Sequence, residues 1–235
     1  MRKAFFFDLD GTLLPLDMDT FTRTYYMQIQ KSGFFDLLGE NGEKTFGQGV
    51  YAMLLNDGRM LNKDAFLKTV TEASGKESGQ IIAHMDRFYE NDFIKVKDSS
   101  QADLRVAETI KVLKDKGYRL ILSTNPLFPP LATNMRIEWA GLSPNDFEYI
   151  SYYDNSHFCK PNLEYFNEVL GVTGLKAEEC YVVGNDVRDD LSAVTLGFEA
   201  FLVIDHVIGD LKEVSECMQG NYSDLLSFAK SLPQI

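Results

Sequence analysis

Cysteine, long apolar runs and positive charge are all scarce in this 235-residue sequence. The cysteines, Cys159, Cys180 and Cys217, form no CxxC pair and are odd in number. They therefore indicate neither a disulfide framework nor a zinc or redox motif, and a reducing cytoplasm is the expected location. No stretch approaches the roughly eighteen apolar residues of a membrane-spanning helix, so a membrane partner is not expected.

Positive charge is outnumbered, with 23 Lys and Arg against 35 Asp and Glu and a formal net charge of -12. Nucleic acid is therefore excluded as a main partner, because its phosphate backbone binds basic surfaces. A small phosphorylated substrate is still compatible with this charge, since one lysine and one metal ion can neutralise it locally. Nothing in the composition indicates an oligomeric state.

Short apolar runs alternate with helical patterns over most of the chain. The runs that are typical of buried strands cover residues 4–7, 118–123, 147–152, 180–183 and 200–204. The helical patterns cover residues 102–116, 131–140, 163–170 and 191–196, and a closing helix is expected at 222–232. A glycine follows each of the first four helical patterns, which is a common stop signal. This alternation predicts an α/β fold, a parallel sheet with helices on both faces.

Residues 16–97 break the alternation. They contain no convincing strand, and residues 21–29, 45–55, 63–73 and 81–89 follow amphipathic helical patterns. The sequence therefore predicts a core made of residues 1–15 and 98–235 and an inserted all-α cap made of residues 16–97. An insert placed directly after the first strand is expected over the carboxyl edge of the sheet, where it can act as a lid.

The most informative motif follows the first apolar run, in the segment Asp8-Leu9-Asp10-Gly11-Thr12. Ligands of open α/β sheets bind at the carboxyl ends of the strands, which is where Asp8 and Asp10 are expected. Two carboxylates two positions apart can hold a hard cation, and one of them can also act as a nucleophile. The structural alternative is an Asx turn, in which the aspartates and Gly11 serve only the backbone geometry.

Three further motifs follow later strands. Thr124 can donate a hydrogen bond to a phosphoryl oxygen, whereas on its own its segment is more typical of a simple turn. Lys160 precedes a proline and is therefore expected at a helix entrance. Asp186, Asp189 and Asp190 follow a buried Val-Val run, where a group of acids is costly unless a cation compensates it or a helix N-terminus uses it.

Together these motifs resemble, in order, those of the haloacid dehalogenase superfamily, and the resemblance extends over the chain outside the cap. The chain resembles phosphatase-like members of the phosphoglycolate phosphatase and β-phosphoglucomutase type, which carry a helical cap between their first and second motifs. The resemblance implies a Rossmann-like core and Mg²⁺-dependent hydrolysis of a phosphate monoester. It implies Asp8 as the nucleophile, Asp10 as the general acid and base, and an aspartyl-phosphate intermediate.

The resemblance also implies the ligands of the site. Mg²⁺ is expected on the Asp8 carboxylate, the Asp10 backbone carbonyl and Asp186. The residues expected to bind the phosphoryl group of the substrate are Thr124, Asn125 and Lys160. The fourth motif departs from the commonest form, because Asn185 stands where many members have an aspartate directly after the glycine. Two registers are therefore open, one with Asp186 as the ligand and Asp190 as the second acid, and one with Asn185 in the ligand position. In the second register Asp189 can hold a metal-bound water.

Three functions fit these residues. The presence of Asp10 favours phosphoryl transfer over carbon–halogen or carbon–phosphorus cleavage, because the resembling enzymes for those reactions lack an acid there. A sugar-phosphate mutase uses the same residues and returns phosphate to the substrate. A non-catalytic binding protein on this fold has no physical need for an acidic cluster beside one lysine. The substrate stays open among sugar phosphates, phosphoglycolate-like acids and nucleoside monophosphates.

Overall fold

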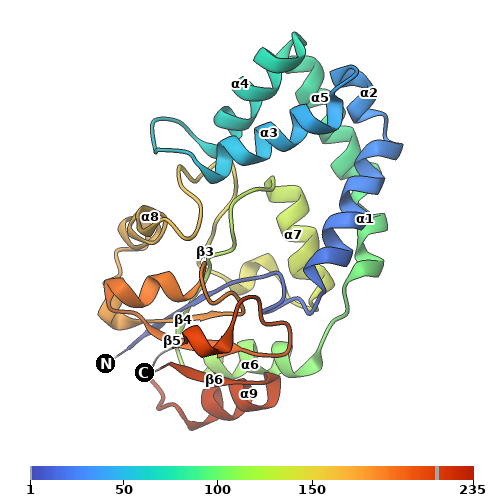
Figure 1. Cartoon of the computed structure of the whole chain (residues 1–235). Helices are drawn as coiled ribbons and strands as arrows, with labels where there is room; N and C mark the ends of the chain where they lie inside the picture. Colours follow the sequence, from blue (N-terminus) through green and yellow to red (C-terminus); the bar gives the residue numbers. More distant parts are fainter. Residues whose placement is uncertain (1, 215–216) are drawn as a thin grey trace.

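The computed structural model describes residues 2–214 and 217–235. Its centre is a parallel six-stranded sheet with the order β3-β2-β1-β4-β5-β6 (Figure 1). The strands are β1 (Ala4–Phe7), β2 (Arg119–Leu122), β3 (Tyr149–Ile150), β4 (Cys180–Gly184), β5 (Glu199–Val203) and β6 (Met218–Gly220). The strand order reverses between β1 and β4, and open α/β sheets bind their ligands outside such a switch point.

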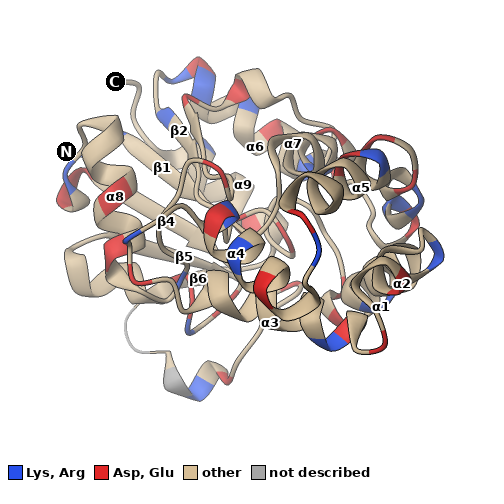
Figure 2. Cartoon of the chain, turned by 90° about the horizontal axis from the view of Figure 1, so that it is seen from above, with Lys and Arg blue, Asp and Glu red and all other residues tan. Residues whose placement is uncertain are grey.

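Helices cover both faces of the sheet, as the sequence predicts. They are α6 (Leu104–Asp115), α7 (Pro130–Trp139), α8 (Leu163–Thr173) and α9 (Tyr222–Ser231), with the 3-10 helices η2 (Pro144–Asp146), η3 (Ala177–Glu179), η4 (Leu191–Leu196) and η5 (Leu211–Glu213). Phe5 and Phe7 of β1 belong to the same buried cluster as Ile110 of α6, whereas Phe6 belongs to a second cluster with Phe166 of α8. The two sides of one strand are therefore both buried, and most charged residues lie on the surrounding helices and loops (Figure 2).

The structure corrects several predicted elements. The helix expected at 163–170 continues through Gly171 to Thr173 and ends at Gly174, whose φ is 66°. A glycine inside a helix costs only about 1 kcal/mol, so packing of the buried face can override it. The segment 191–196 forms the 3-10 helix η4, and the strand expected at 147–152 shortens to β3. Strand β6 was not expected, because its sequence Met-Gln-Gly has no residue pattern typical of a strand. It forms through parallel pairing with β5.

The segment between β1 and α6 is largely helical, and it is called the cap below. It contains α1 (Met18–Lys31), α2 (Phe34–Leu38), α3 (Gly42–Leu54), α4 (Asn62–Ser74) and α5 (Ser78–Asn91), followed by the 3-10 helix η1 (Phe93–Ser99). Helices α2 to α5 stand away from the sheet in Figure 1. Where the chain leaves and rejoins the core, Leu16 and Ser100 form an antiparallel bridge. The boundaries of the cap at residues 16 and 97 stay a prediction.

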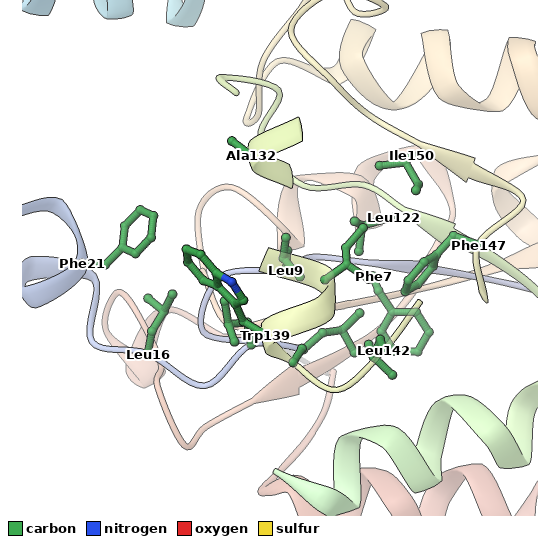
Figure 3. Close-up of a cluster of buried hydrophobic side chains, with 14 of the residues drawn as sticks. Phe7, Leu9, Leu16, Phe21, Leu122, Ala132, Trp139, Leu142, Phe147 and Ile150 are labelled. Atoms are coloured by element: carbon green, nitrogen blue, oxygen red, sulfur yellow. The ribbon is translucent and has the colours of Figure 1, made fainter. Parts of the chain in front are cut away.

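Aromatic side chains join the cap to the core. Phe93 stacks on Trp139 of α7 with ring centres 5.2 Å apart, and Tyr25 of α1 meets Phe128 edge-on at the same separation. Phe21 of α1 faces the same region of the core as Trp139 (Figure 3). Because these rings bury large apolar areas, they hold η1 against α7 and α1 against the loop that precedes α7.

A polar contact joins the other end of the cap to the core. Asn62, the first residue of α4, is fully buried and donates its backbone N–H to the carbonyl of Ser156 over 2.9 Å. Its side-chain amide donates to the carbonyls of Pro126 and Phe158, each over 3.3 Å, and its Oδ1 accepts from Asn56 over 2.9 Å. One cap residue therefore ties together the loops that follow β2 and β3.

Replacing this residue tests the contact. Asn62→Ala removes the side-chain hydrogen bonds to the carbonyls of Pro126 and Phe158 and one of the two hydrogen bonds of the Asn56 amide. We therefore expect the free energy of unfolding to fall by about 2 kcal/mol. Urea denaturation of both proteins at one temperature measures the change. Asn91→Ala is the matched control, because the exposed Asn91 side chain bonds only to the carbonyl of Arg87. Equal changes in the two variants would show that Asn62 does not tie cap and core together.

Candidate active site

The first motif forms a tight turn directly after β1. The backbone N–H of Asp8 still donates to the carbonyl of Val183 in β4 over 2.9 Å, and the N–H groups of Leu13 and Leu14 then converge on the carbonyl of Leu9. Gly11 has a φ of 82°, and a Cβ there would lie 2.3 Å from Nδ2 of Asn185. A side chain at this position would be strained and would push the loop after β4 away.

A buried lysine lies between two aspartates at the centre of the site. Lys160 Nζ is 2.8 Å from Asp8 Oδ1 and 2.6 Å from Asp190 Oδ1. Lys160 is 3% exposed and Asp190 is 1% exposed, so water does not screen these ion pairs. The three side chains come from the end of β1, the loop after β3 and the loop after β4. The structure therefore brings together the predicted nucleophile, the predicted lysine and one of the predicted secondary acids.

Burial shapes the charges of this ion cluster. It raises the pKa of Asp8 to about 7, against the attraction of the Lys160 ammonium. Burial alone would lower the pKa of Lys160, but the carboxylates of Asp190 and Asp8 outweigh it and hold that pKa well above its usual value. Lys160 is therefore held in its charged form between the two carboxylates. A further cation beside Asp8 would favour its ionised form.

The loop after β4 is organised by the carboxylate of Asp190. Asp190 Oδ2 accepts the backbone N–H of Asp186 over 2.9 Å, and Asp186 Oδ1 accepts the N–H groups of Arg188 and Asp189 over 2.8 and 2.9 Å. A Cβ on Gly184 would lie 2.1 Å from Cγ of Asp190, so only glycine allows this approach. Asp190 thus positions both Lys160 and the loop that carries Asp186.

Both ends of the Asn185 side-chain amide are engaged in hydrogen bonds. Asn185 is 2% exposed, its Oδ1 accepts from the Thr12 hydroxyl over 2.8 Å, and its Nδ2 donates to the carbonyl of His206 over 2.6 Å. Both ends of the amide therefore link the turn after β1 to the loop after β5. Asp186, in contrast, lines the same cavity as Asp10 and Asn125.

The second motif lies beside the first because β1 and β2 pair with Phe7 opposite Leu122. Thr124 is 2% exposed, and its carbonyl accepts the Tyr165 hydroxyl over 2.9 Å. The amide of Asn125 joins two other motifs, since its Oδ1 accepts the backbone N–H of Lys160 over 3.1 Å and its Nδ2 donates to Asp189 over 3.2 Å. Asn125 therefore already has a structural role, which the sequence did not indicate.

Arg136 is a site residue that the sequence analysis missed. It comes from α7, is fully buried and forms an ion pair with Asp10 Oδ2. Its guanidinium lies 4.1 Å from the ring centre of Phe128, a cation–π contact. Asp10 Oδ1 has no hydrogen-bond partner in the part of the chain that the structure describes. The sequence does contain a sign that Arg136 is buried. It lies four residues from each of Ala132 and Ala140, on the apolar face of a predicted helix.

The oxygen donors near Asp8 suit magnesium. Residues 2–214 and 217–235 contain no group of three or more His, Cys, Asp or Glu side chains placed to hold a metal ion. The metal ligands implied by the resemblance include only two side chains, the carboxylates of Asp8 and Asp186. The third ligand is the backbone carbonyl of Asp10. All three are oxygen donors, which Mg²⁺ prefers together with water.

Comparison with known proteins assigns the chain to a family. A model of the haloacid dehalogenase-like hydrolases matches residues 2–197, so the chain belongs to that family and is an enzyme of the hydrolase class. This confirms the predicted family and the Rossmann-like fold. A curated relative, the glyceraldehyde 3-phosphate phosphatase of Methanothermobacter thermautotrophicus, is 26% identical over 208 residues, which cover 86% of each chain.

Solved structures show the same fold. A predicted phosphoglycolate phosphatase from Haemophilus somnus matches with a TM-score of 0.61 and 18% identity over 97% of each chain. L-2-haloacid dehalogenase from Xanthobacter autotrophicus matches with a TM-score of 0.60 and 15% identity, covering 99% of this chain and all of that one. The fold is thus shared by enzymes with different reactions, so the reaction must be argued from the site.

The buried Arg136–Asp10 pair gives a stability prediction. Arg136→Met leaves the Asp10 carboxylate beside an apolar side chain, so we expect the free energy of unfolding to fall by about 3 kcal/mol. Denaturant unfolding measures it, and Asp10→Asn in the same background should remove part of the loss because the two residues interact. Arg59→Met is the control, since the Arg59–Asp57 pair is exposed to solvent and contributes little to stability. A loss for Arg136→Met no larger than that of the control would contradict the pair's importance.

Proposed function

We propose that this hydrolase cleaves phosphate monoesters, with Asp8 as the nucleophile and Mg²⁺ as the cofactor. The observation that carries the proposal is the buried contact of Lys160 with Asp8 and Asp190 at the switch point of the sheet. A fixed ammonium beside a carboxylate neutralises part of the charge that a phosphoryl group brings to the same place. The phosphatase among the curated relatives supports the proposal.

The first step uses the residues of the turn after β1. A carboxylate oxygen of Asp8 attacks phosphorus, the bond from phosphorus to the ester oxygen breaks, and an aspartyl-phosphate forms. Asp10, protonated on one carboxyl oxygen when the substrate is bound, gives that proton to the departing alcohol. Because Arg136 holds Oδ2 of Asp10, Oδ1 is the oxygen left for this proton transfer.

The second step releases the enzyme. Asp10, now ionised, takes a proton from a water molecule that attacks the phosphorus of the aspartyl-phosphate. The bond between phosphorus and the Asp8 oxygen breaks, so inorganic phosphate leaves and the Asp8 carboxylate is restored. Lys160 and the Thr124 hydroxyl stabilise the charge on the transferring oxygens in both steps.

Magnesium would be held by Asp8, the Asp10 carbonyl and Asp186, and when bound it offsets the repulsion between these carboxylates and the phosphate. The hydrogen bonds of Asn185 support Asp186 as the ligand, because they engage both ends of the Asn185 amide elsewhere. The helices of the cap would close over this site and exclude water.

A cytoplasmic location is proposed from the cysteine content, and the described part of the chain has no helix fit to cross a membrane.

Metal dependence tests the proposal directly. We expect inorganic phosphate to be released from a panel of phosphate esters in Mg²⁺ and the rate to fall at least about a hundredfold in EDTA, because the site then loses a charge-stabilising group. Release is measured by a phosphate assay, with readdition of Mg²⁺ as the control. Turnover that ignores EDTA would refute the metal assignment. Interconversion of sugar-phosphate isomers without free phosphate would instead identify a mutase.

The nucleophile is tested by one substitution. Asp8→Asn removes the attacking oxygen, so we expect turnover to fall below detection and no radioactive phosphate to be trapped on the protein after acid quench. The fold should persist, because Asp190 still compensates Lys160. Circular dichroism checks folding, and Asp115→Asn, at an exposed carboxylate on the surface, should keep full activity. Sustained turnover by purified Asp8→Asn would show that another group attacks.

A further inference from the structure

A cavity of about 490 Å³ extends from the candidate active site into the cap. Asp10, Asn125 and Asp186 line it on the core side, so it is continuous with the proposed site of phosphoryl transfer. The rest of the wall comes largely from α1, α3, α4 and α5. The part of a substrate that departs with the ester oxygen would therefore lie among cap side chains.

The cap wall of this cavity is strongly apolar. Its side chains include Phe21, Phe46, Met53, Phe66 and Met85, all of them buried. The core adds Leu127 and Phe128 from the loop after β2. A wall of aromatic, methionine and aliphatic groups fits an apolar ligand closely and adapts to its shape.

The polar side chains on the cap wall are a minority, and some of them are already paired. They are Thr22, Tyr25, Tyr26, Lys63, Asp86 and Tyr89. The hydroxyls of Tyr25 and Tyr89 bond to each other over 2.7 Å. The ammonium of Lys63 lies 5.8 Å from the ring centre of Tyr153. Asp86 lines the cavity, but its side chain is exposed to solvent. Away from these groups, a ligand with several hydroxyls would lose water without gaining matching partners, which is unfavourable.

We propose that the cavity binds the leaving group and selects phosphate esters of bulky apolar alcohols, either aromatic or long-chain alkyl. The proposal rests on the proposed function for the reaction itself, and it adds the substrate class. It separates this chain from the relative named for glyceraldehyde 3-phosphate, whose three-carbon polar leaving group would leave most of an apolar cavity unfilled. It also disfavours the sugar phosphates and nucleoside monophosphates that the motifs alone leave open.

A homologous series of esters tests the substrate class. From methyl to hexyl phosphate we expect kcat/KM to rise about threefold with each added methylene, as burial of each group in an apolar wall predicts. In the same assay 1-naphthyl phosphate should exceed glyceraldehyde 3-phosphate by about a hundredfold. A flat series, or a preference for glyceraldehyde 3-phosphate, would overturn the proposal.

A matched pair of variants places the effect in the cavity. Leu67 of α4 lines the cavity and is half-buried, whereas Leu54 of α3 does not line it and is 38% exposed. Leu67→Gln should lower kcat/KM for hexyl phosphate about tenfold and leave that for methyl phosphate unchanged. Leu54→Gln should change neither. Equal losses on both esters would contradict a leaving-group subsite, because a general structural defect would not depend on the alkyl chain.

The binding of ligands that cannot be hydrolysed tests the apolar subsite independently of the proposed reaction. Alkylphosphonates carry a carbon–phosphorus bond, so calorimetric titration with methyl- and hexylphosphonate measures the cavity without turnover. We expect hexylphosphonate to bind at least tenfold more tightly, with a negative heat-capacity change from apolar burial. If this holds while no ester is hydrolysed, the proposed function fails and the apolar subsite stands. If esters are hydrolysed but chain length affects neither binding nor rate, the subsite fails alone.

Discussion

The buried ammonium of Lys160 is the constraint on which the rest of the site depends. An unpaired charge in the interior is strongly unfavourable, so Lys160 requires the carboxylates that it contacts in Asp8 and Asp190. These partners follow different strands, and the contact therefore fixes the ends of β1 and β4 and the loop after β3 relative to one another. Two carboxylates around one lysine also leave a net negative charge, which a divalent cation would offset.

Close backbone approach makes this arrangement possible. Gly11 and Gly184 each lie where a Cβ would collide with a side chain of the fourth motif, Asn185 in one case and Asp190 in the other. The glycines of the first and fourth motifs are therefore explained by packing between the motifs, as well as by the turn that each one forms. Asn185 and Asn125 then complete the framework, because each uses both ends of its amide to join separate loops.

Residues at the ends of strands could be predicted from sequence, whereas residues on helix faces could not. Parallel strands present their carboxyl ends at one edge, so the motifs of Asp8, Thr124 and Lys160 had to converge once the strand alternation was recognised. Arg136 reaches Asp10 from α7 through a tertiary contact that no local pattern encodes. Likewise, the apolar stripes of α1, α3 and α4 predict helices that bury one face. They do not reveal that part of this face encloses a cavity instead of packing against the core.

The two sides of the site have opposite character, and this has a chemical consequence. The core supplies the charged groups around Asp8, while the cap supplies an apolar wall beside Asp10 and Asp186. An apolar wall lowers the local dielectric and excludes water, which strengthens the attraction between Lys160 and a phosphoryl group. The net charge of -12 repels anionic esters at long range, but salt screens this repulsion beyond about 10 Å. Under the proposed function, selection of the substrate would fall to contacts inside the cavity, where the burial of an apolar leaving group can outweigh the repulsion that its phosphate meets outside.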